Sequence, residues 1–297
     1  DSGAGNGPFG FGWSLSLPSI TRKTDKGLPQ YRDPEDSDVF ILSGAEDLVP
    51  VLLESGGKWE REPVPSRTVD RETYEIVRYR PRIEGLFARI ERWTNRVSSR
   101  DIFWRSISKD NITTWYGKTE ESRIFDPADP ARVFGWLICE SHDDKGNVIV
   151  YGYKEENSDK VDQSQAHERN RTDTTRSENR YLKRVKYGNQ MPYFADLQAV
   201  PPTPLPAKWF FEVVFDYGDH DPNRPLPDEP AKKWDCRNDP FSSYRAGFEV
   251  RTYRLCQRVL MFHHFPNEQG GGQDCLVRSI RHIVNAVVVD HGFFTAH

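Results

Sequence analysis

Four strand-like runs follow one another closely in the sequence: Tyr74-Glu75-Ile76-Val77-Arg78-Tyr79, Leu86-Phe87-Ala88-Arg89-Ile90-Glu91-Arg92-Trp93, Asp101-Ile102-Phe103-Trp104-Arg105-Ser106-Ile107 and Ile112-Thr113-Thr114-Trp115-Tyr116-Gly117. Their side chains alternate with period two, which predicts pleated strands with two different faces. Lys109-Asp110-Asn111 is typical of a tight turn between the last two. The connections are too short for parallel crossovers, so this segment predicts an antiparallel meander.

Other parts of the chain repeat this pattern. Phe134–Glu140 and Asn147–Tyr153 flank Asp143-Asp144-Lys145-Gly146, which predicts a hairpin. Val39–Leu42 and Leu48–Leu53 predict a second hairpin with a longer loop. The segment 247–265 predicts one long strand with a bulge near Gln257-Arg258, and Gly270-Gly271-Gly272 is expected to return the chain into a strand at 275–279.

The opening stretch, residues 5–18, alternates glycine with aromatic residues and then serine with leucine. We expect it to organise the chain as a strand that packs a sheet. Its predicted buried face contains Phe9, Phe11, Trp13, Leu15 and Leu17, and the other face is nearly bare. This stretch has no chemical group suited to catalysis.

Composition places the chain in the mainly β class. Its 297 residues include 8 Trp, 12 Tyr and 17 Phe, with 21 Gly and 21 Pro as turn formers. The net charge of −4 gives no general electrostatic reason to bind nucleic acid or an anionic membrane. No apolar run reaches the ~20 residues of a transmembrane helix. The four cysteines have no metal-binding spacing and are predicted to be free thiols.

Long polar segments separate the strands. Residues 154–180 contain almost no apolar side chain and are predicted to form a mobile loop. Pro201–Pro206 predicts a stiff extended connector. Residues 220–240 predict another long loop, and such loops fit best on the outside of a large sheet.

Candidate chemical sites are few, and structural roles are favoured at each. His263-His264 would point to opposite faces of a strand. Asp143–Asn147 lacks the ligand pattern of a calcium loop. Asp216–Asp221 places carboxylates beside His220, which would suit an acid/base or metal site, although a turn is favoured. Glu60-Arg61-Glu62 has the bare Glu-x-Glu spacing of ADP-ribosyltransferases without their other strands. We therefore predict no catalytic, cofactor-binding or metal-binding residue and no enzymatic activity.

Several long strings resemble a known family. They are Gly5–Gly27, Leu28-Pro29-Gln30-Tyr31, Asp38–Gly44, Phe248–Cys256, Val259–Phe265 and Asp274–Ser279. They are similar to the SpvB-type virulence-plasmid B domain, which opens the B component of bacterial Tc insecticidal toxin complexes. The resemblance covers 1–279, with 1–125 and 126–279 as candidate β subregions, and 280–297 is a divergent tail. In the family further residues precede this point, so we expect a piece of a longer protein.

The hairpin 134–153 also resembles one YD repeat of the RHS family, and 181–189 and 210–219 resemble weaker copies. The resemblance implies large, curved antiparallel sheets in a hollow β shell that encloses a toxic C-terminal polypeptide. It implies the C component and the A component of a Tc complex as partners, without nucleic acid or membrane insertion. It also implies a path from the bacterial cytoplasm to the outside. The expected structural anchors are Phe9, Phe11, Trp13, Trp136, Tyr151, Tyr153, Phe248 and Tyr253. The alternatives are an enzyme, either a hydrolase or an ADP-ribosyltransferase-associated toxin domain, and a glycan-binding β module.

Overall fold

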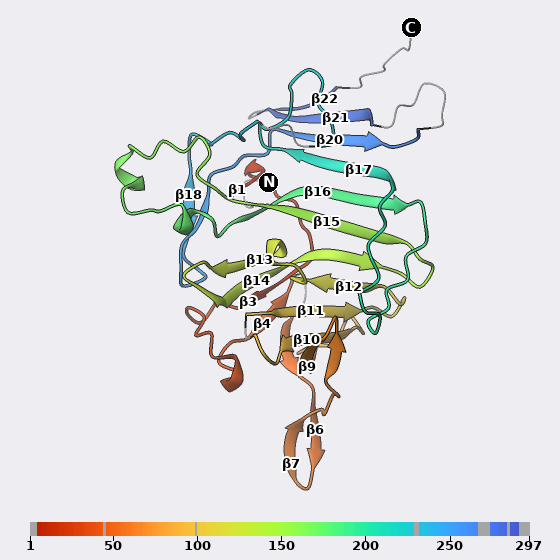
Figure 1. Cartoon of the computed structure of the whole chain (residues 1–297). Helices are drawn as coiled ribbons and strands as arrows, with labels where there is room; N and C mark the ends of the chain where they lie inside the picture. The colour runs from red at the N-terminus through yellow and green to blue at the C-terminus, as the bar shows by residue number, and fades with distance from the viewer. Residues whose placement is uncertain are drawn as a thin grey trace.

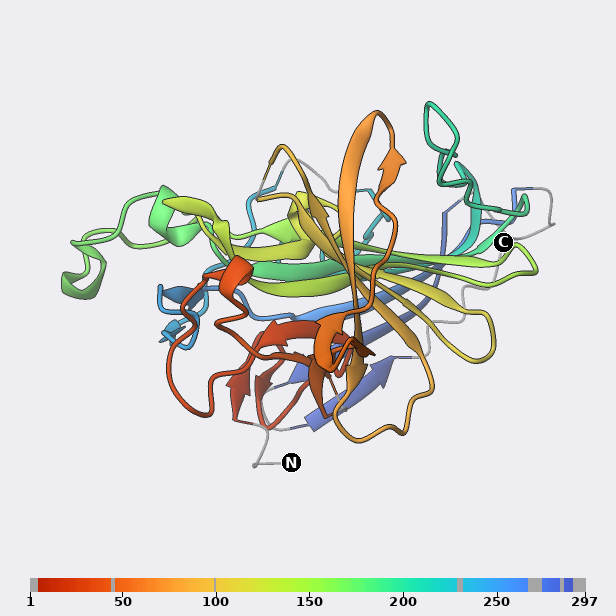
Figure 2. The ribbon, with the colours of Figure 1, turned by 90° about the horizontal axis from the view of Figure 1, so that it is seen from below.

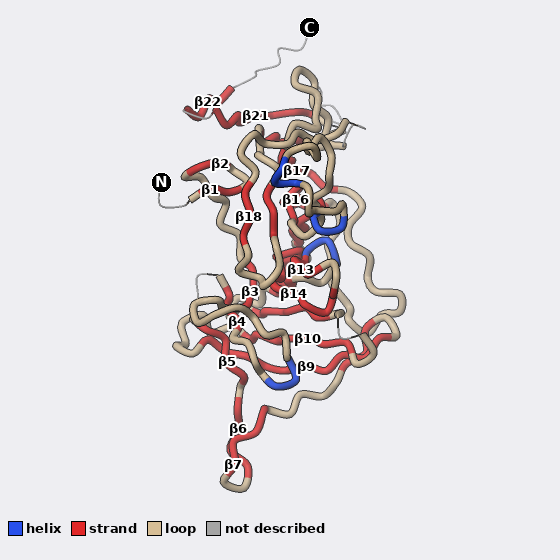
Figure 3. The backbone as a smooth tube through the Cα atoms, turned by 90° about the vertical axis from the view of Figure 1, so that its left-hand side faces the viewer, coloured by secondary structure: helices blue, strands red, loops and turns tan. Residues whose placement is uncertain are grey.

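A computed structural model describes residues 5–43, 46–98, 100–228, 232–266, 274–283 and 286–290. Strands dominate it, and the helical segments are short 3-10 turns (Figure 3). These turns are η2 (Asp33–Glu35), η3 (Glu120–Ser122), η4 (Ala166–Glu168) and η5 (Thr174–Arg176). The mainly β class predicted from composition is confirmed.

Eight strands close into a barrel, which forms the lower half of the molecule in Figure 1. They are β3 (Ser19–Arg22), β4 (Phe40–Leu42), β5 (Asp47–Pro50), β9 (Glu72–Pro81), β10 (Arg89–Asn95), β11 (Ile102–Ile107), β12 (Thr113–Tyr116) and β14 (Asp129–His142). The barrel closes because β14 pairs with both β3 and β12. All these pairings are antiparallel, and those from β9 to β12 confirm the predicted meander.

The same strand β14 starts an open sheet, which continues upward in Figure 1. The sheet adds, in order, β15 (Val148–Glu155), β16 (Arg180–Asn189), β17 (Trp209–Asp216), β20 (Arg258–His263), β21 (Cys275–Ile283) and β22 (Ala286–Asp290). Along one edge of β14, Gly135–Leu137 pair with β3 and Glu140–His142 pair with β15. β14 is therefore the fork at which the barrel and the sheet separate.

Shorter strands complete the fold. β8 (Arg67–Val69) pairs with β9, and β13 (Arg123–Asp126) pairs with β14. Three small hairpins are β1 (Asn6–Gly7) with β2 (Gly10–Phe11), β6 (Leu52–Ser55) with β7 (Lys58–Arg61), and β18 (Phe241–Ser243) with β19 (Val250–Thr252). The β6–β7 hairpin projects away from the barrel, as Figures 1 and 2 show.

Two cores lie on opposite sides of the barrel wall. The inner core is aromatic, with Phe40, Trp104 and Trp136 in mutual ring contact at centroid distances of 5.0, 5.7 and 5.9 Å. The outer core contains Trp93 and Trp115, and it is covered by Val64, Val69 and Leu197 from other segments. Period-two alternation in the meander fits this arrangement, because both faces of these strands are buried.

One row of cross-strand partners crosses from the barrel into the sheet. It runs through Arg78, Glu91, Arg105, Trp115, Glu140, Val150, Lys186, Glu212 and Phe262. Opposite charges on neighbouring strands of an antiparallel sheet stabilise their register. Opposite charges face each other within the barrel wall, where Glu91 lies between Arg78 and Arg105, and within the sheet, where Lys186 lies opposite Glu212. They therefore help to fix the register within each region.

The predicted long strand over 247–265 is wrong. It is divided into β19 and β20, which belong to different sheets. Between them, the backbone N–H of Tyr253 donates to Glu156 and to the Tyr181 hydroxyl, and that of Cys256 donates to the Pro8 carbonyl. These donors are therefore not available to a strand ladder. The predicted turn at 270–272 lies outside the described residues, as does the end of the tail from 291.

Candidate functional site

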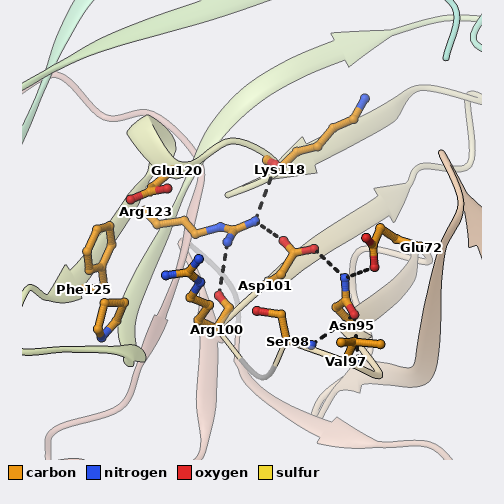
Figure 4. Close-up of a pocket in the computed structure, with 11 residues that line it drawn as sticks. Glu72, Asn95, Val97, Ser98, Arg100, Asp101, Lys118, Glu120, Arg123 and Phe125 are labelled. Atoms are coloured by element: carbon orange, nitrogen blue, oxygen red, sulfur yellow. Dashed lines mark hydrogen bonds and ion pairs between the residues drawn. The ribbon is translucent and has the colours of Figure 1, made fainter. Parts of the chain in front are cut away.

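A hollow of about 400 Å³ opens where several barrel strands begin or end (Figure 4). Arg123, at the start of β13, lies at its centre. Its Nε donates to the Gly117 carbonyl at 2.5 Å, and Nη2 donates to Asp101 Oδ1 at 2.7 Å. Nη1 donates to the Arg100 carbonyl at 3.1 Å. All three guanidinium nitrogens therefore already have partners inside the fold.

Both carboxylate oxygens of Asp101 likewise accept hydrogen bonds inside the fold. Its Oδ2 accepts from the Tyr74 hydroxyl at 2.7 Å and from Asn95 Nδ2 at 3.3 Å. Burial opposes ionisation of Asp101, but the hydrogen bonds from Tyr74 and Arg123 outweigh it and lower the pKa of this carboxyl. A carboxylate with a low pKa and occupied oxygens is a poor general base at neutral pH. The chemistry of this hollow is that of a structural ion pair.

In the segment 216–221, which sequence singled out for acid/base chemistry, residues 216–220 are buried and Asp221 is exposed. Asp219 is 0% exposed, and its Oδ1 and Oδ2 accept hydrogen bonds from Lys183 Nζ at 2.8 and 2.9 Å. His220 lies beside the same ammonium, with Nε2 3.0 Å from Lys183 Nζ and Nδ1 2.9 Å from the Leu226 carbonyl. These contacts require a proton on Nδ1 and a lone pair on Nε2, so the ring is neutral.

The pKa values of this cluster agree with that assignment. Burial and the Lys183 charge lower the pKa of His220. Burial disfavours the charged form of Asp219, but Lys183 and Lys154 outweigh it and hold the pKa of Asp219 well below its usual range. Such shifted groups are common at active sites. Here, however, the 0% exposure of Asp219 and 1% exposure of His220 deny a substrate access.

The polar segment 154–180, predicted to be mobile, makes buried ion pairs. Glu156 accepts from Arg254 Nε at 2.7 Å and from the Tyr181 hydroxyl at 2.5 Å, and both charged side chains are 0% exposed. Glu168 accepts from the Tyr253 hydroxyl at 2.6 Å and Arg176 Nε at 3.1 Å. Buried charges need partners, and these partners anchor the segment at Glu156 and Glu168. Its mobility stays a prediction.

A second hollow of about 400 Å³ lies between this segment and residues 236–240. Its walls include Glu168 and Tyr253, which are bonded to each other, and Cys236, whose thiol pKa is raised by burial. A thiol with a raised pKa is mostly protonated and unreactive at neutral pH. In the part of the chain that the structure describes, no group of three or more His, Cys, Asp or Glu is placed to hold a metal ion. No described helix is long and apolar enough to span a membrane.

Comparison with known proteins identifies the family. The model of the family described as Salmonella virulence plasmid 65kDa B protein, SpvB, matches residues 1–265. The chain belongs to the SpvB family.

Two curated SpvB proteins show the extent of the similarity. The mono(ADP-ribosyl)transferases SpvB of Salmonella typhimurium strain 14028s and Salmonella dublin are each 40% identical to this chain over 275 residues. The alignments cover 91% of this chain and 44% of each relative. The chain therefore spans less than half the length of these curated proteins.

Solved structures share the fold. The N-terminal domain of the effector SpvB from Salmonella typhimurium strain LT2 superposes with a TM-score of 0.81 at 40% identity, covering 95% of this chain and 86% of that one. The TcdB2-TccC3 structure superposes with a TM-score of 0.79 at 30% identity, covering 94% of this chain and 13% of that one. The Photorhabdus luminescens Tc holotoxin pore superposes with a TM-score of 0.76 at 31% identity, covering 94% of this chain and 13% of that one. The SpvB fold of this chain is thus also a segment of much longer Tc toxin chains.

The expected anchors of the SpvB fold lie in different environments. Trp136 and Tyr253 are 0% exposed. Tyr151 and Tyr153 are half-buried between strands, and the Tyr153 hydroxyl donates to the Ile138 carbonyl beside the fork at 2.8 Å. Phe248 is half-buried against Arg132.

In the opening stretch, only part of the expected aromatic face is buried. Phe9 packs on Phe215 at 5.9 Å, but Phe11 is 69% and Trp13 is 52% exposed. The predicted continuous strand is wrong because Gly10 and Gly12 take φ values of +89° and +80°, which turn the backbone. The structure contains only the short β1–β2 hairpin there.

The remaining sequence candidates have structural partners. Asp143 Oδ1 accepts from the backbone N–H of Lys145 and Asn147, as in a turn. His263 contacts the Phe211 ring at 5.0 Å. Glu62 pairs with Arg78 at 2.8 Å. All four cysteines are free, which confirms the prediction.

Sequence reasoning missed the ionic clamps that hold the long segments. Arg254 and Glu156 are separated by 98 positions, and Lys183 and Asp219 by 36. The signal in the sequence for such a clamp is a charged residue inside a strand-like run, such as Arg254, which follows Tyr253 and lies two positions before Cys256. Nothing in the local sequence indicates which distant carboxylate it meets.

Proposed function

We propose that this SpvB-family chain is a non-enzymatic wall module of a bacterial toxin. In this role it forms part of a hollow β shell around a toxic C-terminal polypeptide. The observation that carries the proposal is the uninterrupted sheet that leaves the closed barrel at β14 and continues to β22. Within the described residues β22 pairs only with β21, so the sheet offers an edge at which a longer wall can continue.

The distribution of charge supports a structural role. Asp101, Asp219 and His220 are bonded inside the fold, and the hollow in Figure 4 contains a saturated ion pair. A wall built this way gains rigidity, because removing one partner of a buried pair is strongly unfavourable. The TcdB2-TccC3 similarity supports the same position within a much longer chain.

The partners in this proposal are the C component and the A component of a Tc complex. The protein would be made in the bacterial cytoplasm and released as part of that assembly. In this proposal, the transferase activity in the name of the curated relatives belongs to the part of those proteins that lies outside this chain. This division fits an alignment that covers 44% of the relatives, and it fits the described hollows, where Arg123 bonds to Asp101 and Glu168 bonds to Tyr253.

The test uses the full-length protein that contains this chain, co-expressed with its C component. Protection of the C-terminal cargo from trypsin is measured by the half-life of the cargo band. Leu260→Asp places a charge at a fully buried site of β20, and Leu226→Asp is the matched control at a site that is 56% exposed. We expect Leu260→Asp to expose the cargo and the control to protect it.

Two results would reject the proposal. One is a cargo that stays protected when the whole segment 1–290 is deleted. The other is NAD-dependent ADP-ribosylation by this chain alone, measured with labelled NAD.

A further inference from the structure

The loop between β9 and β10 displays large apolar side chains to water. Ile83 is 67%, Leu86 43% and Phe87 71% exposed. Phe87 has a φ of +49°, a region that bulky residues avoid. Glu84 Oε1 accepts the backbone N–H of Gly85 at 3.1 Å and of Phe87 at 2.7 Å, which fixes this conformation. Strained backbone of this kind is concentrated at binding sites.

The surface next to this loop is basic. Register pairs Tyr79 with Ile90, and both side chains belong to the inner barrel core. Their neighbours Arg80 and Arg89 therefore project from the outer face of adjacent strands. Both are exposed, and within the described residues Arg80 makes no ion pair. Like charges on neighbouring strands are unfavourable for stability alone.

Carboxylates are too few to neutralise this surface. Glu91 is shared by Arg89 at 2.5 Å and Arg105 at 2.7 Å. Arg67 lies nearby with its guanidinium 6.0 Å from the Trp93 ring centroid. Glu91 is 1% exposed, whereas the Arg89 side chain is 42% exposed. The positive groups thus face solvent and the carboxylate does not.

At the other end of the loop, one carboxylate is again shared by two cationic side chains. Asp47 accepts from Arg82 at 3.0 Å and from Lys23 at 2.7 Å. The Arg82 side chain is 59% exposed, and the Asp47 side chain is 13% exposed. Exposed guanidinium groups therefore border the apolar loop on both sides.

We propose that Arg82–Arg89 is a docking loop for an acidic polypeptide segment that carries apolar side chains. The partner's apolar residues would pack on Leu86 and Phe87, because aromatic anchors dominate protein interfaces. Its carboxylates would pair with Arg80 and Arg89, because guanidinium groups bind carboxylates in bidentate geometry.

The chemistry of the patch favours a polypeptide over other anions. Nucleic acid presents closely spaced phosphates that are best matched by an unbroken basic surface. Here Glu84 lies inside the loop, and Asp47 and Glu91 lie beside it. A polypeptide can place single carboxylates opposite single arginines and leave the other positions apolar.

The experiment measures fluorescence anisotropy with the whole chain. The probe is a fluorescein-labelled peptide of sequence Glu-Asp-Leu-Phe-Leu-Asp-Glu, and its charge-reversed counterpart is Lys-Arg-Leu-Phe-Leu-Arg-Lys. We expect saturable binding of the acidic peptide only, with lower affinity at higher salt. Arg80→Gln combined with Arg89→Gln should weaken binding roughly fivefold. Phe87→Ala should weaken it roughly tenfold.

Matched controls separate docking from folding. Arg96→Ala with Val97→Ala removes an exposed arginine and an apolar side chain, 88% exposed, from the β10–β11 loop and should not change binding. Phe87→Asn removes the ring but keeps a residue that tolerates positive φ, so it should bind as weakly as Phe87→Ala. Three outcomes overturn the proposal: no saturable binding of the acidic peptide, equal affinity in all variants, or preference for phosphatidylserine vesicles or single-stranded oligonucleotide over the peptide.

Discussion

The barrel and the open sheet both bury the faces of their strands, but different side chains cover those faces. The barrel interior is filled by its own strands, with Phe40, Trp104 and Trp136 in edge-to-face contact. The open sheet cannot close on itself, so long polar segments cover it and are held by buried pairs such as Glu156–Arg254. The barrel core is thus built by its own strands, whereas the open face combines an apolar cluster, which includes Tyr181, Phe215 and Trp234, with ionic clamps to the segments that cover it.

This difference predicts distinct modes of failure in the two regions. Loss of apolar volume should damage the barrel most, and loss of one charged partner should release the covering segments of the sheet. Three changes test the comparison.

The largest effect is expected for Trp136→Ala. Trp136 is 0% exposed, contacts Trp104 at 5.9 Å and donates from Nε1 to the Ile102 carbonyl at 2.8 Å. Its loss leaves a large cavity at the fork and should lower the free energy of unfolding by about 3–5 kcal/mol. Urea denaturation measures the change. Trp59→Ala, at a site that is 68% exposed, is the control and should cost less than about 0.5 kcal/mol. Similar values for both would show that the barrel interior is not a tightly packed core.

Glu156→Ala tests the clamps of the sheet. It leaves the Arg254 guanidinium buried without its carboxylate, which should cost about 3 kcal/mol. We expect faster tryptic cleavage within 160–175 while the near-ultraviolet circular dichroism of the barrel aromatics is retained. Glu54→Ala is the control, because Glu54 lies on the exposed β6 strand. Unchanged cleavage in Glu156→Ala would contradict the clamp model.

The smallest effect is expected for Glu178→Gln. Glu178 is 4% exposed, and its Oε2 has no hydrogen-bond partner. Burial, with the nearby carboxylates of Glu249 and Asp126, raises its pKa to about 8. The neutral carboxyl is therefore favoured in the fold, and wild-type stability should fall as pH rises from about 4.3 through about 8.

Glutamine should remove this dependence, so its stabilising effect relative to wild type should be absent near pH 4 and grow towards pH 8. Thermal unfolding across this pH range gives the measurement. Glu54→Gln, on the exposed β6 strand, is the control. A pH profile that is identical in wild type and Glu178→Gln would show that this carboxyl does not titrate as proposed.

Local pattern was sufficient for much of the fold. The hairpin joining β4 and β5 was predicted from two apolar runs, and the structure pairs Phe40 with Leu48. The hairpin joining β14 and β15 was likewise predicted, and Glu140 pairs with Val150. These elements involve neighbours in sequence, so turn chemistry and period two specify them.

The opening stretch shows where the same reasoning fails. Alternation alone predicted a buried face that included Phe11 and Trp13, but positive φ at Gly10 turns the chain before a strand can form. The division at 125/126 remains a prediction. It falls within β13 (Arg123–Asp126), which pairs with β14, the strand that belongs to both regions.

The sequence by itself determined the β class, the meander, the β4–β5 and β14–β15 hairpins and the SpvB resemblance, because each depends on residues close together in the chain. Only the tertiary structure decided that β12 meets β14 to close a barrel, and that Glu156 meets Arg254. These contacts join residues far apart in sequence, and their energy depends on burial. Burial is a property of the assembled fold and not of any local stretch.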